Sequence, residues 1–448
     1  MKLTIYFILC CLVACTSCSH YLDPKNSNAY QVPASIRDLQ DILDDFGYMN
    51  ERRTPSYAES AADDYFLLDN NYKALLPEMK LLYKWEAFDY AYPNDWSSAY
   101  LPIYNANFCL EILDKIERTD VNSSDWKNVY GSAHFYRAYY LLQLLWTYAP
   151  AFDPEGQNGE KGIVLRFKSD FNVKSEFSTV GECYQQVLKD AQTAAENLDD
   201  VPLLKSRPSK AGAYALLARA YLSMGLYEQA GNAADESLKL FNELMDYNQP
   251  EDGVKISASV PFSKFTKETI FYSEMGQKFQ NYIPTRALID SNLMNSYESA
   301  DLRRIAFFSA SGKYFKFKGT YSHSIQWMFS GLTTAEMLLI RAESNARKGT
   351  LKASMQDVNL LLKNRWDRTK VFVPKAAQDN NEALGIVLLE RRKELLMRGI
   401  RLSDIKRLNL EGTAIKMVRM IEGERVELSP NSSKLILNTP TDLDVFLR

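Results

Sequence analysis

Apolar residues recur at helical spacing along most of the chain. Between residues 35 and 48 they stand three or four positions apart, with Ser35 placed as an N-cap and Gly47 as a stop. The same period predicts further helices over 96–118, 125–148, 181–197, 209–242 and 332–410. The pattern therefore predicts a mainly α-helical protein.

Two stretches interrupt this helical pattern. Residues 150–182 are polar and glycine-rich, which predicts a loop with a short strand. Residues 245–330 mix short aromatic runs such as KYFKFKG with Gly, Pro, Ser and Asn, which predicts irregular loops with a few short strands or hairpins. We therefore expect a loop-rich insertion over 245–330 to divide the helices.

Some of the predicted helices share the tetratricopeptide spacing of small and large residues. In the first pair the matching positions are Leu217, Ala218, Tyr221, Gly225, Tyr227, Ala230 and Ala234. Residues 334–362 repeat the spacing with Ala342, Gly349 and Ser354, and 382–409 predict one more pair. Because one pair cannot bury its apolar face alone, we expect stacked pairs to form a curved scaffold that carries the insertion.

The first residues have the pattern of a lipoprotein signal. A single charge, Lys2, precedes an apolar run over 3–14, and about twelve residues are too few for a membrane span, which needs roughly twenty. Small residues then precede cysteine, whose thiol can carry lipid. We expect a signal over 1–17 and lipidation of Cys18, with Cys15 as the alternative. A plain cleaved signal is the competing interpretation.

Composition excludes several classes of function. The chain has 448 residues, with 53 basic and 56 acidic ones and a net charge of −3, which gives no basic face for nucleic acid. Beyond residue 18, cysteine occurs only as Cys109 and Cys183, too few for a disulfide framework. No segment after the signal is apolar enough to cross a bilayer.

The chain lacks the motifs of common enzyme and metal sites. No G-x-S-x-G, Walker, H-E-x-x-H or dinucleotide loop is present, so we expect no catalytic residues and no cofactor. His134 has no second ligand at metal-binding spacing, and the acidic loop 153–160 lacks the EF-hand spacing, so we expect no metal. A glycoside hydrolase would need two carboxylates in one cleft, which no motif indicates.

Four stretches, in order along the chain, resemble the SusD/RagB family of outer-membrane nutrient-binding lipoproteins. They are SCSHYLDPKNSN; WSSAYLPIYNANFCLEIL followed by GSAHFYRAYYLLQLLWTYAP; SKAGAYALLARAYLSMGLYEQA; and EMLLIRAESNARKG with LLERRKELLMRGIRLSDIKRLN. The resemblance implies an N-terminal region over 18–230 and a C-terminal region over 231–448, which includes the insertion. It also implies the tetratricopeptide-like fold.

The resemblance further implies a function. Such proteins sit on the outer face of the outer membrane, bind a glycan or other nutrient without changing it, and act as a lid on a SusC-like TonB-dependent barrel transporter. The helical scaffold packs on the barrel, and the irregular part carries the ligand. The alternative from the residues alone is a tetratricopeptide-like scaffold for protein partners at the outer membrane.

Two regions offer the aromatic and polar side chains that a sugar site combines. The candidate residues are Asn94, Asp95 and Trp96 in the loop before one helix, and Tyr314, Tyr321, Gln326 and Trp327 in the insertion. Family members often place a ligand-contacting Trp or Asn in the first loop. The competing interpretation for each aromatic residue is packing in the core.

Other conspicuous residues are assigned to structure. We place Trp85, Trp126, Trp146 and Trp366 in helical runs and expect them in the core. The ERRKE run over 390–394 is expected to form surface and inter-helix ion pairs.

Overall fold

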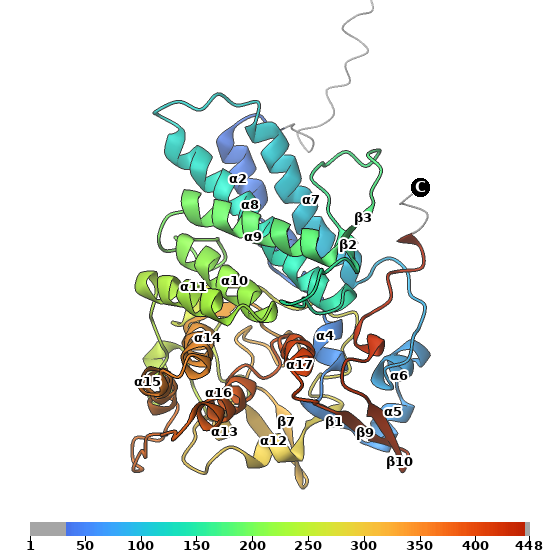
Figure 1. The fold of residues 1–448 in the computed structure, drawn as a ribbon, viewed down its shortest axis with the longest axis vertical. Coiled ribbons are helices and arrows are strands. Elements are labelled where there is room, and N and C mark those ends of the chain that lie inside the picture. Colours follow the sequence, from blue (N-terminus) through green and yellow to red (C-terminus); the bar gives the residue numbers. More distant parts are fainter. Residues whose placement is uncertain (1–32, 444–448) are drawn as a thin grey trace, which may run out of the picture.

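Helices are the dominant regular structure of the protein, which a computed structural model describes from residue 33 to residue 443 (Figure 1). Within this range there are sixteen helices and ten short strands, and the strands form five separate two-stranded sheets. The predicted mainly α-helical class is therefore confirmed. The predicted signal over 1–17 and both candidate lipidation cysteines lie outside the described residues.

The described residues up to 240 form ten helices. They are α2 (Ile36–Asp44), α3 (Phe46–Met49), α4 (Tyr57–Ala61), α5 (Asp69–Lys73), α6 (Pro77–Tyr83), α7 (Asp95–Leu113), α8 (Ser123–Tyr148), α9 (Val180–Asn197), α10 (Lys210–Ser223) and α11 (Tyr227–Leu240). The second half adds α12 (Ser291–Asn295), α13 (Arg303–Ala306), α14 (Thr334–Arg347), α15 (Leu351–Lys363), α16 (Asn380–Glu394) and α17 (Arg401–Leu410).

The strands are short, and each pairs with only one neighbour. They are β1 (Tyr65–Leu67), β2 (Lys161–Val164), β3 (Phe177–Thr179), β4 (Thr269–Phe271), β5 (Ala287–Ile289), β6 (Phe308–Ser311), β7 (Tyr314–Phe317), β8 (Leu332–Thr333), β9 (Met417–Ile421) and β10 (Glu424–Leu428). The pairs, all antiparallel, are β1–β5, β2–β3, β4–β8, β6–β7 and β9–β10.

The first predicted helix is confirmed at its start and wrong at its end. Ser35 caps α2, and its side-chain oxygen accepts a hydrogen bond from the Asp38 backbone N–H. Asp45 adopts an extended conformation that ends α2, and its side chain then caps α3. Gly47 therefore lies inside a second short helix and is not the stop.

The scaffold is a stack of helices in which each one from α7 to α11 packs against the next, and α14 continues the stack (Figure 1). Two of the three predicted pairs are α10 with α11 and α14 with α15, while the third stretch, 382–409, forms α16 and α17, of which α16 packs on α14 and α15. Gly225 and Gly349 follow the first helix of each pair with φ of 72° and 79°, a backbone conformation that favours glycine. The Ser354 hydroxyl donates to the Ala342 carbonyl at 2.8 Å, so the second pair packs closely at the small residues.

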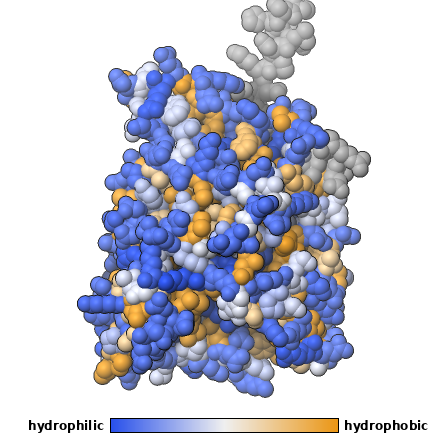
Figure 2. Space-filling model, in the orientation of Figure 1, coloured by the Kyte–Doolittle hydropathy of each residue, from blue (hydrophilic) through white to orange (hydrophobic). Residues whose placement is uncertain are grey.

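The face drawn in Figure 2 is mostly hydrophilic, with small hydrophobic areas scattered over it. Across residues 33–443, no helix combines the length and the apolar character that a membrane crossing needs.

Residues 245–330 are loop-rich with a few short strands, as predicted, and their elements α12, α13 and β7 lie at the end of the molecule opposite α2 (Figure 1). Strands β5 and β4 tie this insertion to the rest of the chain, because they pair with β1 and β8. The sequence did not predict helices α4 to α6 or the C-terminal hairpin β9–β10, which are short and depend on contacts with distant residues.

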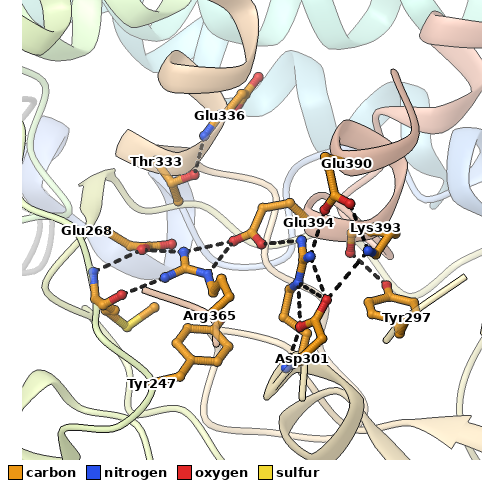
Figure 3. Close-up of polar contacts among 12 residues, drawn as sticks. Tyr247, Glu268, Tyr297, Asp301, Thr333, Glu336, Arg365, Glu390, Lys393 and Glu394 are labelled. Atoms are coloured by element: carbon orange, nitrogen blue, oxygen red, sulfur yellow. Dashed lines mark hydrogen bonds and ion pairs between the residues drawn. The ribbon is translucent and has the colours of Figure 1, made fainter. Parts of the chain in front are cut away.

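Buried ion pairs also join the insertion to the helices (Figure 3). From α13, Arg303 donates to Glu390 at 2.7 Å and to Glu394 at 3.1 Å. At the end of α15, Arg365 donates to the same Glu394 and to Glu268, both at 2.8 Å. Glu394 thus bridges two arginines, and all five side chains are buried.

The expectation of surface ion pairs over 390–394 is therefore wrong for most of this run. Glu390, Arg391, Lys393 and Glu394 are buried, because their partners arrive from parts of the chain that helical periodicity cannot reveal. The inter-helix part of the prediction is confirmed, since Arg391 pairs with a carboxylate of α17 at 2.8 Å.

The four tryptophans assigned to the core divide into two groups. Trp85 and Trp146 are buried, as predicted, although Trp85 follows α6 and does not lie in a helix. Trp126 and Trp366 are half-buried, and Trp366 follows α15 instead of lying in a helix. Trp126 packs against the edge of the core, whereas the Trp366 ring packs on Phe372, so the core assignment is wrong for Trp366.

Candidate functional site

Helix α7 begins at two polar residues that fix its first turn. Asn94 is the N-cap, and its side-chain oxygen accepts from the Ser97 N–H at 2.9 Å. The buried Asp95 carboxylate accepts from the backbone N–H groups of Ser56 and Tyr57 at 2.6 and 3.0 Å. Burial raises the pKa of Asp95 to about 6 even though these donors oppose it. Both residues thus position the next one, Trp96.

A row of aromatic side chains runs along one side of α7. Its members stand at every fourth position, which places them on one helix face: Trp96, Tyr100, Tyr104 and Phe108. The ring centroids of Trp96 and Tyr100 are 4.8 Å apart, and those of Tyr104 and Phe108 are 6.4 Å apart. Because a helix carries them, the rings are held in place before any ligand arrives.

The first three of these rings line a cavity of about 560 Å³, which we name the α7 cavity. Its opposite side is the loop over 165–176 that joins β2 to β3 and projects beside α7 (Figure 1). Phe171 of this loop is 78 % exposed and stacks on Tyr104 with ring centroids 5.1 Å apart and planes 16° from parallel. The cavity is therefore lined by aromatic rings, of which Phe171 is largely open to solvent and Trp96 is buried.

Polar side chains also line the α7 cavity. They are Arg53, Ser97, Ser98, Asn107, Arg166, Lys168 and Ser175. The Asn107 amide donates to the Arg166 carbonyl at 2.9 Å, which attaches the loop to the helix. The Arg166 guanidinium donates to the Ser175 hydroxyl at 2.7 Å, which keeps it inside the loop. Aromatic faces beside a few fixed donors match the chemistry of a sugar, with its C–H faces and hydroxyl groups.

The structure brings only part of the predicted site together. Trp96 lines the cavity, while Asn94 and Asp95 support it from behind. Tyr314 lies in the β6–β7 hairpin at the opposite end of the molecule (Figure 1). Tyr321 is buried, and its hydroxyl donates to Glu268 at 2.9 Å. Neither tyrosine lines the α7 cavity.

The remaining two candidates lie in an exposed turn of the insertion. The Arg52 guanidinium lies over the Trp327 ring, 5.1 Å from its centroid, and the neighbouring Arg53 lines the cavity. Gln326 is exposed and its backbone N–H donates to Ser324. Trp327 is thus linked to the cavity through two consecutive arginines, although it is not part of the lining.

Apart from Trp96, the lining residues were not predicted as site residues, and four of them show why: Tyr104, Arg166, Lys168 and Phe171. The four-residue spacing of aromatic side chains along α7 was a signal for the first. For the other three, the polar loop over 165–176 shows no periodicity that would place it against a helix more than fifty residues earlier.

His134 has a structural role. Its Nδ1 lies 2.7 Å from Asp190, which also accepts two bonds from Arg137 at 2.7 and 2.8 Å. In residues 33–443, no three His, Cys, Asp or Glu side chains are grouped so that they could hold a metal ion.

Comparison with known proteins gives two family models that together match more than half of the chain. The model described as starch-binding and associating with the outer membrane matches residues 20–222, and the model described as the SusD family matches 334–434. No curated protein matches the sequence significantly.

Several solved structures share the fold. A SusD superfamily protein from Bacteroides fragilis has a TM-score of 0.72 and 20% identity, covering 93% of this chain and 99% of its own. A SusD-like carbohydrate binding protein from Bacteroides vulgatus has a TM-score of 0.67 and 18% identity, with coverage of 92% and 97%. Surface glycan-binding protein A from Bacteroides fluxus has a TM-score of 0.61 and 18% identity, with coverage of 84% and 89%.

Proposed function

Because the chain belongs to the SusD/RagB family, we propose that it is a surface lipoprotein of the outer membrane that binds an oligosaccharide in the α7 cavity. It binds this ligand without chemical change and passes it to a TonB-dependent barrel transporter. The observation that carries the proposal is the cavity of about 560 Å³ with Trp96, Tyr100 and Tyr104 on a rigid helix. Rings that are already ordered lose little conformational entropy when a ligand stacks on them.

The direct test is calorimetry of the protein against a panel of neutral and acidic oligosaccharides. Tyr104→Ala and Phe171→Ala remove rings that are partly or largely exposed, so the fold should tolerate them. We expect each to weaken binding roughly ten-fold, the loss of a typical buried aromatic contact. Phe265→Ala, at an exposed aromatic residue in the insertion, serves as the matched control.

Two results would contradict the proposed site. One is a panel in which no oligosaccharide binds to a protein that is folded by circular dichroism. The other is a ligand whose affinity is unchanged by both ring substitutions, since that ligand would bind elsewhere.

The lipid anchor is the second part of the proposal. It is supported by the N-terminal segment, in which an apolar run is followed by cysteine. Mass spectrometry of the protein from membranes should find an acylated N-terminal peptide beginning at Cys18, or at Cys15 if the first cut site is used. An unmodified amino terminus at either residue would contradict lipidation.

The barrel partner is supported by the family alone. Purification of the protein from outer-membrane extracts should bring down a large barrel protein. Recovery with soluble proteins alone would favour the tetratricopeptide-like scaffold instead.

A further inference from the structure

The α7 cavity has an unusual charge for a protein that is slightly acidic overall. Arg53, Arg166 and Lys168 line it, and no Asp or Glu of the described residues does. The whole chain carries a net charge of −3, so this concentration of positive charge is local.

Neutral groups hold the two arginines in place. Arg53 donates from Nε and Nη2 to the Gly47 carbonyl at 3.0 and 2.6 Å, and Arg166 donates to the Ser175 hydroxyl and the Asp170 carbonyl. Within residues 33–443, neither guanidinium has a carboxylate at ion-pair distance. Their side chains are thus positioned while their charge stays uncompensated.

Only the third cation, Lys168, has a carboxylate at ion-pair distance among the described residues, and that pair is long. Lys168 Nζ lies 4.0 Å from Glu111, which already accepts from the Ser169 N–H at 3.1 Å. Asp442 accepts from the Tyr92 N–H at the rim, and Asp95 is buried below Trp96. None of these three carboxylates lines the cavity.

We propose that the ligand of the α7 cavity is an acidic oligosaccharide whose carboxylate or sulfate groups bind Arg53, Arg166 and Lys168. This inference rests on the proposed function and specifies its ligand class. Guanidinium groups bind carboxylates and sulfates through charge-assisted hydrogen bonds, and a neutral sugar leaves that capacity unused. Tyr104 and Phe171 then stack on the sugar rings.

The test compares three ligand classes by calorimetry at low salt and at physiological salt: oligogalacturonates for carboxylate, chondroitin sulfate fragments for sulfate, and maltooligosaccharides as neutral sugars. We expect one acidic class to bind tightly. The affinity for the neutral class should be lower by roughly ten-fold or more. The acidic class that binds identifies the anionic group. Added salt should weaken this binding.

Charge variants locate the effect. Lys168→Gln and Arg166→Gln should each weaken acidic-ligand binding about ten-fold. The Arg166 side chain also holds its loop through hydrogen bonds, so Arg166→Gln removes both the charge and this support. Arg166→Lys keeps the charge but loses part of the hydrogen bonding, and it should retain more affinity than Arg166→Gln. The control is Lys174→Gln, which removes an exposed lysine of the same loop that pairs with Glu176 and does not line the cavity.

The outcomes separate this inference from the proposed function. Neutral sugars that bind as tightly as acidic ones, with no response to Lys168→Gln, would overturn the charge inference and leave the glycan-binding function intact. Acidic ligands that bind regardless of Tyr104→Ala would also overturn it, since they would be adsorbed elsewhere. Binding of no oligosaccharide would overturn both.

Discussion

Glu394 bridges the two arginines that join the insertion to the helices, and Glu394→Gln tests how much this bridge stabilises the protein (Figure 3). Burial raises the pKa of this carboxyl, but the Arg365 and Arg303 guanidiniums outweigh burial and lower it from 4.5 to about 2. At about 1.4 kcal/mol per pH unit, such a shift corresponds to about 3 kcal/mol of stabilisation. Breaking a buried ion pair typically costs about 3 to 5 kcal/mol.

The assay is equilibrium unfolding in urea, followed by circular dichroism, for the wild type and the variant at pH 7 and at pH 3. We expect Glu394→Gln to lower the free energy of unfolding by about 3 kcal/mol at pH 7. The pKa of Glu394 is lower in the folded protein than in the unfolded chain. Its stabilisation is therefore complete above pH 4.5 and is lost as the pH falls towards 2. The difference between the two proteins should shrink at pH 3.

The control is Glu228→Gln, which breaks an exposed pair with Lys348 of 2.9 Å. Exposed pairs contribute about 0 to 1 kcal/mol, so this variant should unfold close to the wild type. The reasoning is refuted if Glu394→Gln loses no more stability than Glu228→Gln, or if its loss is the same at both pH values.

Two further predictions concern packing and pH. A Cβ at Gly231 would clash with Ser344 of α14, so Gly231→Ala should lower the free energy of unfolding by about 1 to 3 kcal/mol, and adding Ser344→Gly should restore part of it. Burial and the nearby Asp64 raise the pKa of Glu59 to about 8. The folded state then holds a proton that the unfolded chain releases above pH 4.5, so stability should fall as the pH rises from 4.5 to 8. Glu59→Gln should abolish this fall in urea midpoints measured across that range.

The helices of the scaffold were predictable because their signal is local. The run that became α8 ends at Tyr148, just before Pro150, as the pattern indicated. The glycines after α10 and α14 likewise mark real helix ends. In each case the spacing of apolar residues and the terminating residue lie within one short stretch of sequence.

Elements that depend on distant partners were not predictable in this way. Residues around α4 are held by Arg419 of β9, whose guanidinium donates to the carbonyls of Ser60 and Ala62 at 2.9 Å. The same guanidinium lies 4.0 Å from the centroid of the Tyr83 ring. These contacts span more than three hundred residues, and no local pattern reveals them.

The candidate site shows the same division. Trp96 was predicted as a site residue because aromatic rings cover the flat faces of sugars and because it lies where a helix begins. It does line the cavity. Asn94 and Asp95 looked like ligand-binding groups, but their oxygens are used to cap α7 and to anchor it to the segment at Ser56. Phe171 was missed because the sequence of its polar loop shows no pattern that indicates packing against α7.

One wall of the α7 cavity is a helix of the scaffold, and the other is a surface loop. The two walls therefore differ in how freely their residues can change. Substitutions along α7 disturb rings such as Trp96, which also packs against Tyr148 of α8. The loop over 165–176 is largely exposed, and surface loops tolerate changes of length and composition. Substitutions in the loop over 165–176 should therefore change which ligand the cavity binds, with little effect on the helices that form the fold.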